Sequence, residues 1–206
     1  MQPQPLNFGL LDDLFGKISS YNVEKQYVEE VLSGRTESFR HIIQISQPLV
    51  EQIVNRLISK ELFRQDMVQE IYIKVFQHLD RFRFDCKLTT WIARIAYNYC
   101  LTEIQSRKNL PLDKIDVLLL TPSVQSNPLE ESISADLKTI MDQEINLLPP
   151  LFKTILLLYH RQEQSIEEIQ LITGLPAGTI KSYLFRARAT LAQQLSLKYK
   201  KSELGI

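Results

Sequence analysis

The stretch "SIEEIQLITGLPAGTIKSYLFRARATL", residues 165–191, contains two helix-like segments separated by a short turn. Ser165 is a favourable helix N-cap, and Glu168 three residues later completes the pattern of a capping box. Gly174 is a favourable residue just past a helix end, and Pro176 is tolerated in the first turn of the next helix. A helix, a short glycine-containing turn and a second helix form the pattern of a helix-turn-helix unit.

The second of these helices has one apolar stripe and a basic surface. At about 100° per residue, four residues fall within one narrow stripe that we expect to be buried: Ile180, Leu184, Ala187 and Leu191. On the remaining surface, Arg186 can reach guanine O6 and N7, and Phe185 can contact a thymine methyl. Lys181 and Arg188 are better placed for phosphates. A solvated basic face on an ordinary helix is the alternative, but it leaves the turn, the cap and an exposed Phe185 unexplained.

The chain of 206 residues has no net charge, but its charges are unevenly distributed. Residues 147–206 carry eight bases and four acids, residues 109–146 carry seven acids and two bases, and residues 24–108 carry thirteen bases and eleven acids. A basic, acidic, basic order indicates two nucleic-acid-facing units joined by an acidic connector. Random surface variation is the alternative explanation.

Composition argues against several classes of protein. The six glycines form neither a dinucleotide-binding nor a P-loop pattern, and the aliphatic runs "VLLL" and "ILLL" are far shorter than a membrane span. The start "MQPQPLNFGLLDD" lacks the features of a secretory signal. Cys86 and Cys100 are fourteen residues apart, which is neither a zinc-ligand spacing nor a disulfide framework. We therefore expect reduced thiols, a cytoplasmic location, and no metal or cofactor.

Helix-spaced apolar residues recur along most of the chain and predict an all-α fold of two small units. In the first unit we expect a short helix that ends at Gly34, a second that starts in the Thr36/Ser38 region, and a third that opens with Pro48 as its first residue. Two further helices follow Asp66 and an N-cap at Thr90. Three prolines and a Ser/Asn/Gln cluster then predict a flexible linker. The predicted parts are an extension of unassigned role at 1–23, a first unit at 24–108, an acidic linker at 109–134, and a second unit at 135–206.

The segment "DRFRFDCKLTTW", residues 80–91, interleaves basic and aromatic residues. Such a composition suits single-stranded DNA, because rings stack on bases while cations follow the backbone. Packing in the core is the alternative for the aromatic residues, and it is the favoured one for Phe82 and Trp91.

At these residues the sequence resembles the extracytoplasmic-function (ECF) group of bacterial sigma factors, in the sigma-70 family. The motif "DMVQEIYIKV", followed by "LDRF" and "TWIARIAYN", is similar to region 2 of that family. The stretch from "LPPLFKTILLLYH" to "RARATL" is similar to region 4, and the likeness covers residues 24–195 or so. The two motifs in this order, with an acidic linker between them, are far more specific than either alone.

The resemblance implies a promoter-specificity subunit of the stress-response type that joins bacterial RNA polymerase and performs no catalysis itself. The first unit would dock on the clamp helices of the polymerase largest subunit through Arg64, Asp66, Gln69 and Glu70. The loop 83–89 would receive a flipped minus-10 base, and the melted strand would lie along the next helix; the residues implied are Arg83, Phe84, Asp85, Lys87, Thr89, Trp91, Arg94 and Asn98. The second unit would bind the polymerase flap and recognise duplex DNA at the minus-35 element through Thr179, Lys181, Ser182, Phe185, Arg186 and Arg188. An anti-sigma factor is a further implied partner.

Some positions depart from the family pattern, and two other classes of protein remain as alternatives. Tyr183 stands where an arginine is frequent, and Gln170 stands where a small alanine is usual. A stand-alone helix-turn-helix regulator would explain the second unit but not "DMVQE" or the aromatic loop. An enzyme is disfavoured because the histidines are scattered (His41, His78 and His160), and because Glu167 and Glu168, being adjacent on a helix, point about 100° apart.

Overall fold

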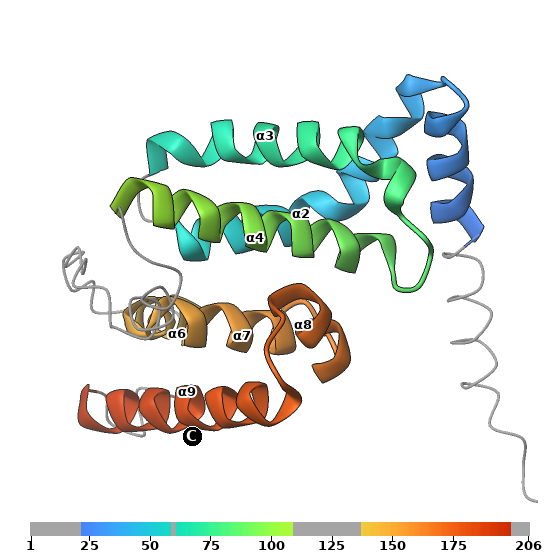
Figure 1. Cartoon of the computed structure of the whole chain (residues 1–206). Helices are drawn as coiled ribbons and strands as arrows, with labels where there is room; N and C mark the ends of the chain where they lie inside the picture. The colour runs from blue at the N-terminus through green and yellow to red at the C-terminus, as the bar shows by residue number, and fades with distance from the viewer. Residues whose placement is uncertain (1–21, 59–60, 109–136, 199–206) are drawn as a thin grey trace, which may run out of the picture.

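The computed structural model describes residues 22–58, 61–108 and 137–198, and within these ranges it contains helices and no strand. In Figure 1 one layer holds α2 (Phe39–Leu57), α3 (Arg64–Gln77) and α4 (Leu88–Lys108), together with the helix 22–32. Below it lie α6 (Leu137–Leu147), α7 (Pro150–His160) and α8 (Ile166–Thr173), and α9 (Ala177–Lys198) runs on the far side of these. Three short 3-10 helices complete the described fold: η1 (Thr36–Ser38), η2 (Glu61–Phe63) and η3 (Leu79–Arg81). The expected all-α fold is confirmed.

The helix at 22–32 ends as predicted at Gly34, which has the left-handed φ of 97° that glycine adopts readily. The helix after it differs from the prediction. Pro48 does not open a new helix but lies inside α2, so the two predicted helices are one. Pro48 has no N–H for the carbonyl four residues earlier, which costs about 3 kcal/mol in a helix interior. We attribute the continuity of α2 to its buried face, which extends on both sides of Pro48 from Ile42 to Leu57.

The start of α4 also corrects the prediction. Thr90 is not the N-cap: α4 begins at Leu88, and Thr90 lies buried inside its first turn. The Leu88 N–H instead donates a hydrogen bond of 3.2 Å to a carboxylate oxygen of Glu24, from the helix 22–32. A long-range carboxylate thus satisfies one of the free N–H donors at the start of α4, where a local side-chain cap at Thr90 was expected.

The three longer helices of the first unit pack on one another around fully buried side chains. Ile53 of α2, Ile71 and Val75 of α3, and Ile92 and Ala96 of α4 are all inaccessible to solvent. Burying each large side chain contributes about 1.5–3 kcal/mol. This core fixes α3 and α4, the two helices that carry most of the predicted first-unit sites.

The second unit follows the sequence prediction closely. Pro150 is in the first turn of α7, and Ser165 and Glu168 form the predicted capping box: the Ser165 Oγ accepts from the Glu168 N–H at 3.1 Å, and Glu168 accepts from the Ser165 N–H at 2.8 Å. Gly174 ends α8 with a φ of 74°. In α9 the buried residues are the four predicted ones, Ile180, Leu184, Ala187 and Leu191.

The two units pack against each other. Helix α8 lies on α4 and α7 lies on α2, and one hydrophobic core continues through both units. The side chain of Gln162 donates a hydrogen bond of 2.8 Å to Gln52, and Arg56 donates to Asn146. The predicted linker 109–134 and residues 1–21 of the predicted extension 1–23 fall outside the described residues.

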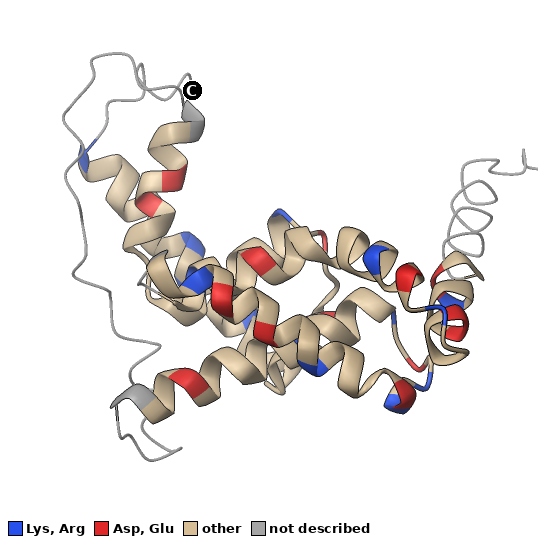
Figure 2. Ribbon diagram, turned by 90° about the horizontal axis from the view of Figure 1, so that it is seen from above, with Lys and Arg blue, Asp and Glu red and all other residues tan. Residues whose placement is uncertain are grey.

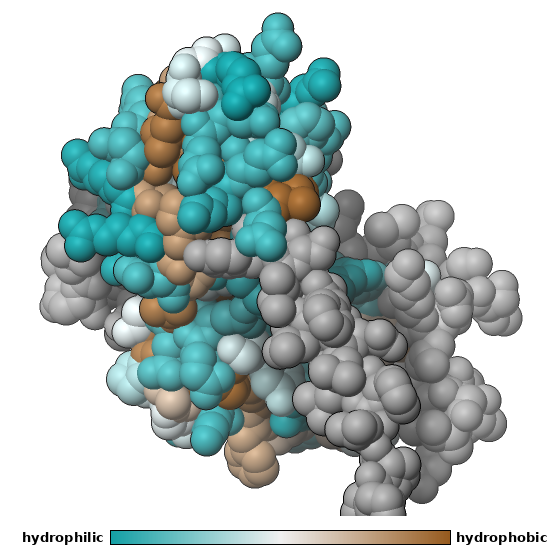
Figure 3. All heavy atoms as spheres, turned by 90° about the vertical axis from the view of Figure 1, so that its right-hand side faces the viewer, coloured by the Kyte–Doolittle hydropathy of each residue, from teal (hydrophilic) through white to brown (hydrophobic). Residues whose placement is uncertain are grey.

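Basic and acidic residues are interspersed along the helices of the first unit (Figure 2). On the face that Figure 3 shows, hydrophobic atoms form narrow bands between broad hydrophilic areas. None of the helices in the described ranges is long and apolar enough to cross a membrane.

Candidate nucleic-acid and polymerase interfaces

The outer face of α9 is open to solvent and carries every residue predicted for it. Phe185 is 73% exposed, on the side of the helix away from its buried stripe. The polar and basic residues predicted to accompany it are exposed as well: Lys181, Ser182, Arg186 and Arg188. The exception is Thr179, which is half-buried. A large aromatic ring in water does not stabilise the fold, and its exposure leaves Phe185 accessible to a partner.

Two residues at the end of α7 hold one of these arginines. The guanidinium of Arg188 lies over the ring of Tyr159, 5.5 Å from its centre, and its Nε donates to Nε2 of His160 at 3.2 Å. Burial, together with the nearby Arg188 charge, lowers the pKa of His160. Sequence analysis did not find this cluster, because nothing in the local pattern pairs residues 28 positions apart.

The aromatic loop is built around a buried ring. Phe82 is 7% exposed and packs between Phe84 and Trp91, with ring centres 4.6 and 5.5 Å away. Core packing, the favoured alternative for Phe82, is therefore correct, and Trp91 is half-buried. Phe84 has a φ of 60°, which bulky residues rarely adopt. Such strain costs about 1–3 kcal/mol and occurs frequently at functional sites.

The remaining residues predicted for the minus-10 element lie on the loop and on one face of α4. Arg83, Asp85 and Lys87 are exposed on the loop, and Thr89 is half-buried. Arg94 and Asn98 are exposed one turn apart on α4, following Trp91 along the helix. The structure thus brings the predicted residues into one region beside the loop. Their contact with DNA remains a prediction.

Lys87 connects this region to the second unit. Its Nζ lies 2.7 Å from a carboxylate oxygen of Glu168, which completes the capping box of α8. Although burial favours the neutral acid, hydrogen bonds from Lys87 and the Ser165 N–H hold the pKa of Glu168 below its ordinary value. Burial raises the pKa of Glu24, against the opposing effects of the Leu88 N–H and the Lys87 charge. Lys87 therefore interacts with carboxylates from two separate elements.

The predicted polymerase-docking residues divide into two groups. Asp66, Gln69 and Glu70 are exposed on one side of α3, as their spacing indicates. Arg64 points elsewhere, since its Nε donates a hydrogen bond of 2.9 Å to the Ile58 carbonyl at the end of α2. The structure therefore brings three of the four residues together.

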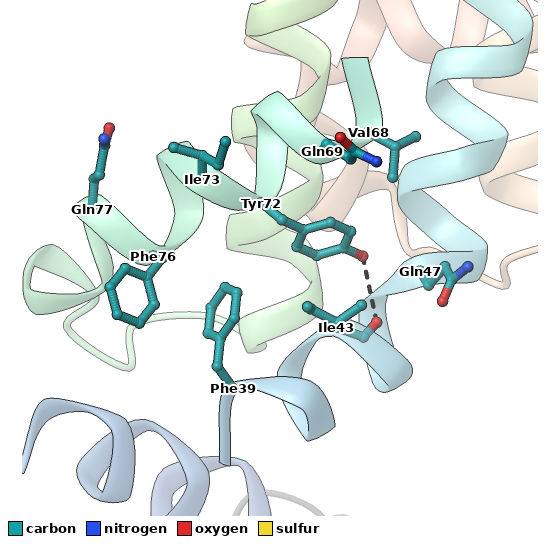
Figure 4. Close-up of a pocket in the computed structure, with 9 residues that line it drawn as sticks. All are labelled: Phe39, Ile43, Gln47, Val68, Gln69, Tyr72, Ile73, Phe76 and Gln77. Carbon is teal, nitrogen blue, oxygen red and sulfur yellow. Dashed lines mark hydrogen bonds between the residues drawn. The ribbon is translucent and has the colours of Figure 1, made fainter. Parts of the chain in front are cut away.

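An apolar groove borders this side of α3. It has a volume of about 680 Å³ and lies between α2 and α3 (Figure 4). Phe39 and Phe76 meet edge to face across it, with ring centres 5.1 Å apart, and Gln69 lies on its rim. Phe76 and Ile73 are 44% and 48% exposed. Sequence analysis missed this groove, although exposed apolar residues on a helix with polar neighbours are a recognised sign of a docking surface.

The seam between the units contains an unusual lysine. Lys153 is only 7% exposed, and its Nζ donates a hydrogen bond of 2.8 Å to the Asn146 carbonyl. Burial, with the charges of Arg56 and Arg64 nearby, lowers the pKa of Lys153 to about 8. This amine destabilises the folded chain when it is charged.

No group of His, Cys, Asp and Glu residues within the described ranges is arranged to hold a metal ion. The features that remain are two surfaces rich in basic and aromatic residues and one apolar groove. Such surfaces suit nucleic acid and protein partners.

Comparison with known families identifies the chain. The family model of sigma-70 region 2 matches residues 42–109, and that of sigma-70 region 4 matches residues 138–191. The chain belongs to the sigma-70 family. The two matches together cover more than half of this sigma factor and occur in the order predicted from its motifs.

Curated relatives place the sigma factor in the ECF group. It is 26% identical to the ECF RNA polymerase sigma factor SigW of Bacillus subtilis over 179 residues, which is 83% of this chain and 96% of the relative. It is 29% identical to the ECF RNA polymerase sigma-E factor of Escherichia coli K12 over 182 residues, 84% of this chain and 95% of the relative.

Two solved structures have a similar fold, and one of them is described as a sigma factor. One is the sigma factor RpoE in complex with the anti-sigma factor NepR from Bartonella quintana, with a TM-score of 0.59 at 24% identity over 79% of this chain and 99% of that chain. Another is CnrH in complex with the cytosolic domain of CnrY, with a TM-score of 0.59 at 17% identity over 85% of this chain and 99% of that one. At such identities the likeness concerns the fold.

Proposed function

We propose that this ECF sigma factor joins the core of bacterial RNA polymerase, directs it to promoters with particular minus-10 and minus-35 elements, and supports opening of the DNA strands. The observation that carries the proposal is the pair of family matches on two helical units, each of which exposes basic and aromatic residues. The sigma factor itself performs no catalysis and acts in the cytoplasm, where the polymerase and the chromosome are.

At the minus-35 element the outer face of α9 enters the major groove of duplex DNA. Arg186 donates to base acceptors, and Phe185 contacts a base edge, for which a thymine methyl is the natural apolar partner. Lys181 and Arg188 on one edge of the helix, together with Thr179 and Ser182, contact phosphates and set its register.

At the minus-10 element the loop 83–89 captures a base that leaves the stack, and Trp91, Arg94 and Asn98 border the melted strand. Extruding a base costs a few kcal/mol, and stacking a base on an aromatic ring returns about 1–3 kcal/mol. Capture of several bases thus stabilises the open strands.

Polymerase docks on the exposed side of α3 formed by Asp66, Gln69 and Glu70, and we propose that the adjoining apolar groove belongs to the same interface. The aromatic residues Phe39 and Phe76 supply the kind of desolvated centre that carries much of the binding energy in protein interfaces.

The second unit would bind the polymerase flap. An anti-sigma factor is the proposed regulatory partner, since both solved structures named above are described as complexes, one of them with an anti-sigma factor by name.

In-vitro transcription with purified core polymerase on a library of promoters tests the function as a whole. We expect selective initiation from a subset of promoters only when the sigma factor is present. Absence of selective initiation would sink the proposal. Tight, sequence-specific duplex binding without polymerase would instead favour a stand-alone helix-turn-helix regulator.

Substitutions test the residue assignments. Asp66→Ala with Gln69→Ala should weaken recovery of polymerase core in a pull-down, and unchanged recovery removes the docking assignment.

Arg186→Ala should weaken the free energy of binding by about 1–3 kcal/mol on the cognate minus-35 sequence and by little on scrambled DNA. An equal loss on both sequences reduces Arg186 to a phosphate contact.

A further inference from the structure

The end of α7 and the middle of α9 form a small cluster around the Arg188 guanidinium. The ring of Tyr159 lies under the guanidinium, and Nε2 of His160 faces its Nε at 3.2 Å and its Nη2 at 2.9 Å. The rings of Tyr159 and His160 meet edge to face, with centres 5.0 Å apart. Each of the three side chains therefore contacts the other two.

The cluster restrains a long side chain on the surface that is proposed to meet DNA. A free arginine loses much rotamer freedom when it binds, and a guanidinium that is already fixed loses less. Arginine has five N–H donors. Only two nitrogens face His160, so the remaining donors can still bind an oxyanion.

His160 can support Arg188 in this way only as a neutral acceptor. A protonated ring has no lone pair to offer, and it would place a second positive charge beside the guanidinium. The lowered pKa of His160 is consistent with the neutral form.

We infer that Tyr159 and His160 are positioning residues that preorganise Arg188 for contact with a DNA phosphate at the minus-35 element. The inference rests on the proposed function of α9 and adds to it two residues outside the helix-turn-helix itself. Lys181 provides a matched comparison, because it is exposed on the same edge of α9 two turns earlier and has no ion-pair or hydrogen-bond partner within the described residues.

The test is a double-mutant cycle on the complete holoenzyme. Its affinity for a duplex promoter chosen from the library is measured over a range of salt concentrations. His160→Leu should weaken binding by about 2- to 10-fold, the range of one net hydrogen bond. The same loss should appear in a Lys181→Ala background and should disappear in an Arg188→Ala background.

Further variants separate positioning from a merely structural role. His160→Gln retains a side-chain acceptor and should recover most of the affinity, while Tyr159→Leu should lose affinity only when Arg188 is present. His78→Leu removes a histidine from the first unit and serves as the control. A His160→Leu loss of equal size in both backgrounds, or no loss at all, overturns the inference.

Failure of the inference and failure of the proposed function give different results. If the unmodified holoenzyme shows no promoter selectivity, the proposed function fails. If it is selective and Arg186→Ala abolishes selectivity while His160→Leu has no effect, only the inference fails.

A further measurement needs no polymerase. The Arg188 Nε–H resonance of the free chain should be shifted and slow to exchange with water, and His160→Leu should remove both properties. A resonance typical of a solvated arginine overturns the inference directly.

Discussion

The two surfaces proposed to meet DNA are built in different ways. The outer face of α9 rests on a buried stripe of the same helix, so helical periodicity alone separates Phe185 from Leu184. The aromatic loop instead takes its shape from other elements: Glu24 of the helix 22–32, Trp91 of α4, and Glu168 of α8. A surface on a regular helix is specified locally, whereas a loop of this kind depends on contacts from distant parts of the chain.

The same substitution in the two surfaces should have very different consequences. Phe82→Ala empties a buried site and should reduce the free energy of unfolding by about 3–5 kcal/mol. Phe185→Ala removes an exposed ring and should change the free energy of unfolding by less than about 0.5 kcal/mol, while weakening promoter binding. Chemical denaturation of both variants measures the difference. Equal losses of stability would contradict the contrast between the surfaces.

The seam that joins the units should become more stable when Lys153 is replaced. Its pKa of about 8 lies below the 10.5 of an unperturbed lysine, so the unfolded chain binds more protons between these pH values and stability rises with pH across that window. Below pH 8 the penalty of burying the charge is complete. Lys153→Met should therefore raise the free energy of unfolding by about 1–3 kcal/mol at pH 7.

The pH dependence identifies the cause of the Lys153→Met effect. The advantage of the variant should shrink from pH 8 towards pH 10.5, as the wild-type lysine loses its proton. Tyr72 and Cys100, whose pKa values burial raises to about 12, titrate in both proteins and cancel in the difference. An advantage that does not change with pH would point to better packing instead.

The backbone of the loop offers a finer test. Phe84→Ala removes the ring but keeps a Cβ at a φ of 60°, whereas Phe84→Gly removes both. The glycine variant should therefore be the more stable of the two by about 1 kcal/mol. Thermal unfolding of the two variants measures this. If the alanine variant is equally stable, the strain at Phe84 is absent.

The smallest expected effect concerns the ion pair between the units. Lys87→Ala should reduce the free energy of unfolding by less than about 1 kcal/mol, because Lys87 is 57% exposed, and the loss should decrease further at high salt. Lys181→Ala on the open face of α9 is the matched control and should have no measurable effect on stability. If the loss of stability in Lys87→Ala is independent of salt, the hydrocarbon stem of Lys87, rather than its charge, holds the units together.

The helix-turn-helix could be predicted almost completely from the sequence, since each of its determinants is local. The capping box at Ser165, the left-handed Gly174 and the stripe from Ile180 to Leu191 all depend on residues within a few positions of one another. The same rules failed at Pro48 and Thr90, where tertiary contacts override local preference. The buried face of α2 continues past the proline, and Glu24 provides the cap that Thr90 does not.

The candidate sites follow the same division. Exposure of Phe185 and Arg186, and of Asp66, Gln69 and Glu70, follows from helical spacing and was predicted. The pairing of Lys87 with Glu168, and of Arg188 with His160, joins residues 81 and 28 positions apart, for which no local pattern exists. The apolar groove likewise requires α2 and α3 to be placed side by side.

The bond between Glu24 and the start of α4 bears on how this protein can be divided into pieces. The family match for the first unit begins at residue 42, but the cap of α4 and the buried residues Val28 and Val31 come from the preceding helix. A fragment cut at the edges of the match would keep the whole aromatic loop and lose the support beneath it. The smallest autonomous piece that presents this loop in its native shape therefore begins some twenty residues before the recognisable motif.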